Sequence, residues 1–339
     1  MTLTRPLSAS RTALMTGGTL AGPLIGLLAF ALYATHDALI KHLGATYSTF
    51  QIVFFSSLFS FPLIILMLLR DPTPGTLRAH HPWWNLARTL TMVTGWAAVF
   101  YAFSVLPLAQ TYAILFATPL LITLLSIPVL GEKVGLHRGA AVLLGLAGVL
   151  IVLRPGGADL TLGHGAALLA AVCSATSSVI VRRIGRDERA AVLMLYPMLA
   201  SVLIMGAVLP FVYVPVAGGD LAALAVVALL AFTAAFCIIA AYRRAEATVV
   251  APMQYSQMIW AALFGWAFFA EIPDRWTLTG ALVIISSGLF ILFRESRGNV
   301  SAHQPVLATR MPMDTSATPR AGLIPEHERP ATPGNTTAR

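Results

Sequence analysis

A carboxylate and an imidazole lie side by side within the first apolar run of the chain. Tyr33, His36 and Asp37 are spaced so that their side chains share one side of a helix. If the run crosses a bilayer, Asp37 lies roughly 22 Å along it, where a carboxylate needs water or a partner. The pattern indicates a site for a proton or a ligand ammonium group, or an ion pair with Lys41, one turn away, that positions the helix. His36 is either a coupling residue of the same site or a structural histidine.

Glutamines and aromatic residues repeat at helical spacing in the segment 248–270. Gln254, Gln257 and Trp260 fall on one face, with Tyr255 beside them. Amides donate and accept hydrogen bonds, and aromatic rings stack, so this face suits a neutral or zwitterionic planar ligand better than a strong anion. The alternative is that the glutamines only bond neighbouring helices. Two further aromatic candidates for ligand contact are Tyr101 and Tyr112.

Segment 84–105 carries a stripe of polar and small residues that begins at Arg88 and reaches Tyr101. Such a stripe either lines a pathway or admits a neighbouring backbone closely, and close packing is the preferred role of Gly95. Arg88 lies near one end of the segment. It either meets a ligand carboxylate or extends to lipid phosphate, and the second interpretation is preferred.

The elements that position these residues follow from composition. The chain has 57% hydrophobic and 11% charged residues, and its mean hydropathy is +0.79, which indicates an integral membrane protein. A helix needs about 20 apolar residues to cross a bilayer. Ten runs meet this requirement and predict ten transmembrane helices, at 22–43, 49–69, 84–105, 108–130, 137–153, 162–181, 190–214, 221–242, 248–270 and 276–293.

Basic residues are distributed according to these helices. A net charge of +8 could indicate nucleic acid as a partner, but with the N-terminus inside, 19 of the 22 Lys and Arg residues fall on the inner side. The exceptions are Lys41, Arg154 and Arg275. This asymmetry predicts a multi-pass protein of the cell inner membrane with both termini cytoplasmic, the lipid bilayer as its surroundings and no nucleic-acid partner.

The two halves of the chain resemble each other at an offset of about 140 residues. GEKVGLHRGAAVLLGLAGVLIVLR (131–154) aligns with AEIPDRWTLTGALVIISSGLFILFR (270–294), and Glu132 stands opposite Glu271. Because each half holds five helices, the second must enter the membrane upside down, which predicts an inverted repeat with a site between the halves. The two glutamates would then lie on opposite sides, so each is expected to have a structural role at its own turn.

The repeat also relates the first helices of the two halves. Lys41 aligns with Arg182, and the positions of His36 and Asp37 align with Ser177 and Ser178. Two related polar faces would therefore flank a central cavity, because unsatisfied polar groups facing lipid are costly. We add both serines to the candidate ligand contacts.

The segments LPLAQTYAILFATPLLITLLSIPVLGEKVGLHRGAAVLLGLAGVLIVLRPG and AEATVVAPMQYSQMIWAALFGWAFFAEIPDRWTLTGALVIISSGLFILF resemble the drug/metabolite transporter superfamily, specifically the EamA-like transporters. The resemblance covers roughly residues 22–294. It implies alternating access, a cavity bounded by helices 1, 3, 4, 6, 8 and 9, and a fifth and tenth helix used for packing or homodimer contacts. Similar proteins carry amino acids, nucleobase-like compounds, riboflavin, S-adenosylmethionine or toxic compounds. Many have an arginine where this chain has Ser56.

These observations predict four regions: an N-terminal cytoplasmic arm (1–20), two five-helix repeats (21–155 and 156–295) and a disordered cytoplasmic tail (296–339). The expected activity is secondary transport of a small neutral or zwitterionic metabolite, driven by protons or by exchange. The alternatives are efflux of hydrophobic or toxic compounds and a membrane-embedded enzyme, although no H-E-x-x-H, G-x-S-x-G or phosphate-binding loop is present. We expect no cofactor and no metal, and Cys173 and Cys237 are expected to be packing residues.

Overall fold

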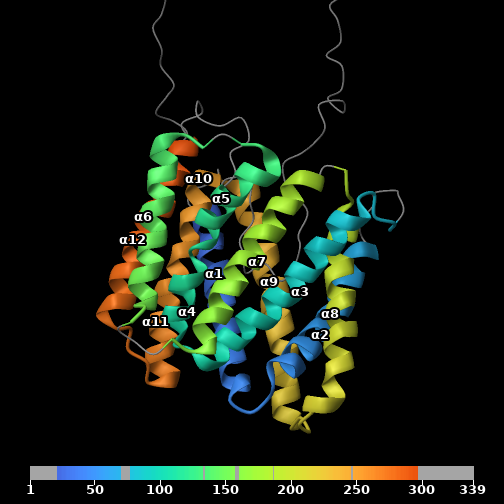
Figure 1. Ribbon diagram of the computed structural model, residues 1–339. Coiled ribbons are helices and arrows are strands. Elements are labelled where there is room, and N and C mark those ends of the chain that lie inside the picture. Colours follow the sequence, from blue (N-terminus) through green and yellow to red (C-terminus); the bar gives the residue numbers. More distant parts are fainter. Residues whose placement is uncertain are drawn as a thin grey trace, which may run out of the picture.

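The computed structural model describes residues 21–69, 77–132, 134–156, 160–185, 187–245 and 247–296. Over these residues the chain is helical almost throughout (Figure 1). The arm expected over 1–20 and the tail expected over 296–339, except for its first residue, lie outside the described part. The helices are α1 (Ala21–Gly44), α2 (Thr49–Leu69), α3 (Pro82–Val105), α4 (Leu108–Leu115), α5 (Thr118–Leu130), α6 (Leu136–Leu153), α7 (Leu162–Ile184), α8 (Ala190–Val212), α9 (Gly218–Arg244), α10 (Ala247–Val250), η1 (Ala251–Tyr255), α11 (Ser256–Phe269) and α12 (Arg275–Ser296).

Each of the ten predicted runs is helical, but two are broken. The run 108–130 divides into α4 and α5, and the run 248–270 divides into α10, the 3-10 helix η1 and α11. Among the described residues, eight helical stretches are long and apolar enough to cross a membrane, and α4 with α5 counts as one of them. The other two predicted runs are α3, which buries Asn85 and Arg88, and the broken segment that ends in α11.

The first break follows from a proline. Pro119 lies in the first turn of α5 and has no N–H to offer the carbonyl of Leu115, four residues earlier. The hydroxyl of Thr118 donates to that carbonyl instead, at 2.7 Å. The chain can therefore change direction at Phe116 and Ala117 while this buried carbonyl keeps a partner.

The helices pack in crossed pairs that join the two halves of the chain. α1 lies along α9, and α3 lies along α7. α6 pairs with α12, and α2 pairs with α8. Figure 1 shows the α6–α12 pair on one side of the bundle and the α2–α8 pair on the other, with α1 and α7 between them. The four helices α1, α2, α3 and α6 of the first half thus each pack along a helix of the second half.

The α6–α12 pair is closely packed at two glycines. A Cβ atom added to Gly280 would lie 2.7 Å from the carbonyl oxygen of Gly148, and one added to Gly148 would lie 2.8 Å from a side-chain carbon of Ile284. Glycine at these two positions therefore permits the close approach of α6 and α12. Gly139 has no such role, because nothing lies within 4 Å of its Cβ position. Gly95 does pack closely, because a Cβ atom added to it would lie 3.1 Å from the Cβ atom of Cys173.

The bundle has two ends, which we name after the basic residue found there. At the Lys41 end, α1 finishes against α3, and at the Arg182 end α7 finishes beside the last residues of α5. Gly22, at the start of α1, lies against Ala245, just after α9. The start of α1 and the finish of α12 lie at the same end of the bundle (Figure 1).

Side-chain bonds connect α2 to the second half at the Lys41 end. Gln51 donates to the carbonyl of Val214 at 2.7 Å and accepts from the Val214 N–H at 2.9 Å. In the α1–α2 loop, the Tyr47 hydroxyl donates to Asp220 at 2.6 Å, and this bond raises the pKa of Tyr47 above its ordinary value. Both predicted packing cysteines, Cys173 and Cys237, are free thiols.

Candidate functional site

Asp37 is the centre of a buried polar cluster. One carboxylate oxygen lies 2.7 Å from Nδ1 of His36, and the other accepts a hydrogen bond from the hydroxyl of Tyr112. The exposed fraction of each of these three residues is 3% or less. Tyr112 also lies in hydrogen-bonding reach of the Gln257 side chain. The cluster therefore joins α1, α4 and α11, and it brings together four of the residues predicted as ligand contacts.

The ion pair between Asp37 and Lys41, one of the two alternatives for Asp37, is not formed. Lys41 lies one turn further along α1, but its ammonium group binds Glu271. The ring of His36 instead packs edge-on against Phe100, with centroids 5.9 Å apart. Asp37 thus obtains its partners from its neighbour in sequence and from α4. The alternative in which Asp37 forms a positioning ion pair with Lys41 is wrong.

Aromatic rings extend from this cluster to the second break. Tyr112 lies 6.0 Å from Phe116, and Phe116 lies 5.2 Å from Tyr255 between ring centroids. Phe116 belongs to the break between α4 and α5, and Tyr255 is the last residue of η1. The two breaks of the chain therefore meet side by side. Backbone irregularity inside a membrane occurs where it is buried in protein or lines a cavity.

The other candidates of the 248–270 segment lie on η1 and α11, where Gln254 is buried and Tyr255 and Trp260 are half-buried. Gln254, in η1, is a neighbour of Tyr255 and is in hydrogen-bonding reach of its hydroxyl. That hydroxyl points at α12, because a Cβ atom on Gly288 would collide with it. Ser256 and Trp260 each bury a polar atom with no hydrogen-bond partner in the described part of the chain. The Ser256 hydroxyl and the Trp260 indole N–H thus lie one turn apart on α11, and neither donates to an acceptor among the described residues.

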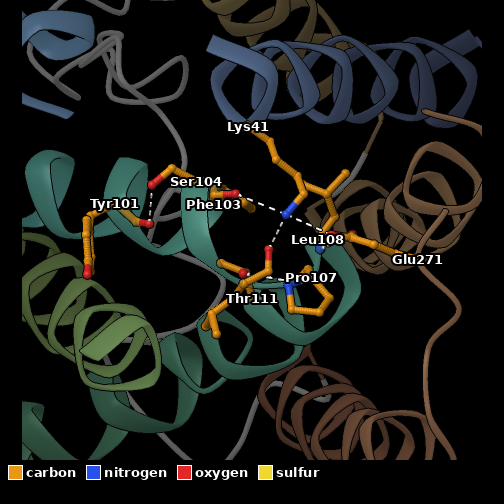
Figure 2. A network of polar contacts seen from close by, with 9 residues as sticks. Lys41, Tyr101, Phe103, Ser104, Pro107, Leu108, Thr111 and Glu271 are labelled. Atoms are coloured by element: carbon orange, nitrogen blue, oxygen red, sulfur yellow. Dashed lines mark hydrogen bonds and ion pairs between the residues drawn. The ribbon is translucent and has the colours of Figure 1, made fainter. Parts of the chain in front are cut away.

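Four predicted contacts lie outside the cluster around Asp37. Tyr33 is buried in an apolar group with α9, which includes Ala234 and Ile238. Tyr101 is half-buried on α3, and Figure 2 shows its side chain directed away from Lys41. Ser177 and Ser178 lie on α7, which packs against α3 and α5.

Arg88 has a structural partner in place of lipid. It is buried, and its guanidinium donates to the carbonyl oxygen of Leu193 on α8. In a regular helix this carbonyl would accept from the N–H of residue 197, but Pro197 has none. The preferred interpretation of Arg88 as extending to lipid phosphate is therefore wrong. The arginine satisfies a carbonyl that a proline leaves free.

Two ion pairs are the main feature that the sequence analysis missed. Lys41 Nζ lies 2.8 Å from Glu271 Oε1 and also donates to the carbonyl of Leu106 at 2.6 Å (Figure 2). The second oxygen of Glu271 accepts from the backbone N–H of Leu108, at the first turn of α4, at 3.0 Å. At the other end of the bundle, Arg182 pairs with Glu132. The alignment of the two halves already pairs Lys41 with Arg182 and Glu132 with Glu271, and this was the available signal.

A crevice of about 240 Å³ opens beside Glu271. Its walls come from the start of α4, the finish of α6, α11 and the loop before α12. Polar side chains that line it include Gln110, Arg154, Glu271 and Asp274, and Arg154 and Asp274 form an ion pair with each other. The crevice therefore reaches the Lys41–Glu271 pair, whose glutamate is part of its wall.

Comparison with known proteins decides the class of this bundle. A profile described as the EamA-like transporter family matches the chain twice, over residues 20–154 and 161–293. The chain belongs to the EamA-like transporter family. This EamA-like transporter is a multi-pass membrane protein, and at the level of the family its activity is transport.

Curated relatives of this transporter carry different small molecules. An S-adenosylmethionine uptake transporter of Rickettsia felis is 24% identical over 278 residues, which cover 82% of this chain and 94% of that protein. A riboflavin transporter of Rhizobium johnstonii is 29% identical over 72% of this chain and 79% of its own length. Pseudopaline exporter CntI of Pseudomonas aeruginosa is 25% identical over 78% of this chain and 93% of its own length. Both uptake and export occur among them.

A solved structure supports the fold alone. A chain titled only "Crystal structure of protein" superposes with a TM-score of 0.57 and 20% sequence identity, over 83% of this chain and 99% of that chain. It therefore supports the helical architecture, and the chemistry must come from the residues of this chain.

Proposed function

We propose that this chain is a secondary active transporter that moves a small neutral or zwitterionic metabolite by alternating access, with its ligand held between Asp37 and the two helix breaks. The observation that carries the proposal is the meeting of the breaks at Phe116 and Tyr255. Discontinuous helices at the interface of two repeats form the substrate sites of many secondary transporters. The cluster of His36, Asp37, Tyr112 and Gln257 lies beside this point.

The proposed architecture is two inverted repeats, 21–155 and 156–295, each with five helices. The paired packing supports it, because α1 on α9 and α7 on α3 are equivalent contacts under the repeat, and the α6–α12 pair maps onto itself. The alignment that pairs Glu132 with Glu271 also pairs Phe116 with Tyr255. We place the chain in the cell inner membrane with both termini and the Arg182 end on the cytoplasmic side, as the distribution of Lys and Arg favours.

A ligand with an amino group and a planar part suits the residues present. Asp37 supplies a carboxylate, Gln254 and Gln257 supply amides, and Trp260 supplies a buried indole N–H that has no acceptor among the described residues. Rings of Phe116 and Tyr255 lie next to them and offer stacking surfaces. S-Adenosylmethionine, the cargo named for the Rickettsia felis relative, combines an amino group with a planar base, so it is the first ligand to test.

We propose His36 and Asp37 as the coupling residues. A carboxylate buried beside an imidazole inside a membrane is a common composition for a proton relay. The hydroxyl of Tyr112 connects this pair to Gln257, so a change of protonation at Asp37 reaches the helix that carries the ligand contacts.

Thermal unfolding of the purified protein with added ligand tests the proposal. Binding to the folded state raises the apparent melting temperature, by an amount that grows with ligand concentration. We expect a saturable shift with S-adenosylmethionine that Gln257→Ala abolishes. Riboflavin and methionine are measured in parallel, and a shift with neither these nor S-adenosylmethionine would contradict the proposed ligand class.

Gln51→Ala is the matched control for that variant. It removes a buried glutamine whose two side-chain bonds go to the backbone of Val214 and not to the cluster around Asp37. We expect it to lower the melting temperature of the ligand-free protein while leaving the ligand-induced shift intact. Loss of the shift in both variants would mean that glutamine removal acts through stability.

A further inference from the structure

The two ion pairs missed by the sequence analysis are equivalents of each other under the repeat. In each pair, the cation lies near the end of the first helix of one half. It binds a glutamate that lies just after the fourth helix of the other half. Lys41 of the first half binds Glu271 of the second, and Arg182 of the second half binds Glu132 of the first. Each pair therefore joins the two halves, and the two joints lie at opposite ends of the bundle.

Both pairs are largely shielded from solvent. The exposed fractions of the side chains are 10% for Lys41 and 20% for Glu271, against 5% for Arg182 and 7% for Glu132. A buried ion pair stabilises little compared with apolar packing of the same volume, so its presence is weak evidence of a purely stabilising role. Its value lies in specifying one arrangement of the elements that it joins.

The Lys41–Glu271 pair holds three elements in one position. Lys41 reaches from α1 to the Leu106 carbonyl in the α3–α4 turn, and Glu271 accepts from the Leu108 N–H at the start of α4 (Figure 2). Separating the pair would free the loop before α12 from α1, and the Leu108 N–H bond would then be the remaining bond between Glu271 and α4. Glu271 also lines the crevice, so a displacement of this loop would change the shape of that opening.

The Arg182–Glu132 pair is backed by a second contact of α7 with α5. Arg183 donates to the carbonyl of Val129 and lies over the ring of Trp84, with 4.9 Å between the guanidinium carbon and the ring centroid. The finish of α5 is thus held against α7 at this end. The structure has both pairs formed at once, as a state closed at both ends requires.

We propose that Lys41–Glu271 and Arg182–Glu132 are the two latches of the transport cycle, which open alternately to admit the ligand from one side and release it to the other. This inference rests on the proposed function, since alternate opening has meaning only for a transporter. It goes beyond that function by naming the residues that close each end. Loss of one latch shifts the population toward the state open at that end.

Cysteine accessibility tests the latches without any ligand. Ser256→Cys is a nearly isosteric probe, because the hydroxyl oxygen of Ser256, at the start of α11 beside the second break, is buried and has no partner among the described residues. It is placed in a background with Cys173 and Cys237 replaced by alanine. A membrane-impermeant maleimide is then added to intact cells and, separately, to inverted membrane vesicles, and the labelling rates are compared.

Removing one latch must change the two rates in opposite directions. We expect Lys41→Gln to raise labelling about tenfold from the side of the Lys41 end and to lower it from the other side. Arg182→Gln is expected to give the reverse pattern. Equal changes from both sides would indicate a loosened bundle, and unchanged rates would indicate ion pairs with no part in access. Either result would overturn the proposal.

Two further variants guard against misfolding and against a general effect of charge. Glu271→Gln breaks the ion pair but keeps an oxygen for the Leu108 N–H, so it should fold and should reproduce the Lys41→Gln pattern. Arg154→Gln is the matched control, because it breaks the ion pair with Asp274 in the same loop, next to the packed α6–α12 helices. It should leave both labelling rates unchanged.

The outcome is separable from that of the ligand experiment. If the labelling pattern is as expected but no ligand raises the melting temperature, only the ligand assignment fails. If a ligand binds but the labelling is insensitive to both latches, the transporter proposal stands and the latch assignment fails.

Discussion

Asp37, His36 and Tyr112 act as one unit, because a change in any of them leaves a buried group of the others without its partner. Asp37 accepts from Tyr112 and contacts Nδ1 of His36. A buried acceptor that loses its donor destabilises a protein by about 1–3 kcal/mol. Under the proposed function, a ligand ammonium group or a proton that arrives at Asp37 would compete with bonds that already exist, which would tie ligand binding to the position of α4.

Asp37→Asn is expected to separate coupling from binding. The amide cannot carry a proton between the two sides, but it keeps an oxygen that can accept from Tyr112. In reconstituted vesicles, uptake should lose its response to a pH gradient while exchange of labelled for unlabelled ligand continues. Uptake that responds to the gradient as in the unmodified protein would exclude Asp37 as the coupling residue.

Arg88 and Pro197 are expected to be coupled energetically. Arg88→Met leaves the Leu193 carbonyl without a donor and should lower the free energy of unfolding by about 1–3 kcal/mol. In a Pro197→Ala background, residue 197 has an N–H for that carbonyl, so the same substitution should have a smaller effect. A double-mutant cycle of apparent melting temperatures measures the difference. Additive effects would show that the arginine has another role.

At the scale of the elements, the helices were predictable and their partners were not. The predicted run 137–153 and the observed α6, Leu136–Leu153, differ by one residue, because hydropathy and helical length alone determine such a segment. Lys41 was expected beside Asp37 on the same helix, but a lysine can extend to another element, and Glu271 lies 230 positions away in sequence. The choice of partner depends on helix rotation, which a single sequence does not encode locally.

For the helix breaks, too, a local feature was predictable from the sequence and a contact between distant segments was not. The position of the first break follows from the missing N–H of Pro119, which is a local property of the sequence. The contact of the two breaks through Phe116 and Tyr255 was not predictable, because it depends on how the halves pack. Of the candidate site, the cluster around Asp37 and Gln257 was assembled from predicted residues, while Tyr33, Ser177 and Ser178 have other surroundings.

Glycine substitutions in α6 and α12 should differ in sign. Gly280→Ala would place a Cβ atom 2.7 Å from the Gly148 carbonyl oxygen, so the helices must move apart, and we expect about 1–3 kcal/mol of destabilisation. Gly139→Ala is the matched control. Nothing lies within 4 Å of its Cβ position, and alanine stabilises a helix by up to about 1 kcal/mol relative to glycine. Thermal unfolding of the two variants decides, and equal losses would contradict the close packing.

At the scale of the whole molecule, the orientation in the membrane remains a prediction from charge. The start of α1 and the finish of α12 lie at one end of the bundle, so both termini should face the same compartment (Figure 1). A green fluorescent protein fused to the C-terminus of the full chain should fluoresce in cells, and alkaline phosphatase at the same point should be inactive. The reverse result would place the Arg182 end outside.

The exchanged ion pairs also describe how the two halves depend on each other. An isologous interface between two subunits is defined by reciprocity, in which residue i of one contacts residue j of the other and j contacts i. Lys41 with Glu271 and Arg182 with Glu132 satisfy this definition within one chain. Each half carries the counter-ion of the other, as two copies of a single five-helix subunit would in an antiparallel dimer. Polypeptides 1–158 and 159–339, co-expressed, should therefore assemble into a working transporter, whereas either alone should not.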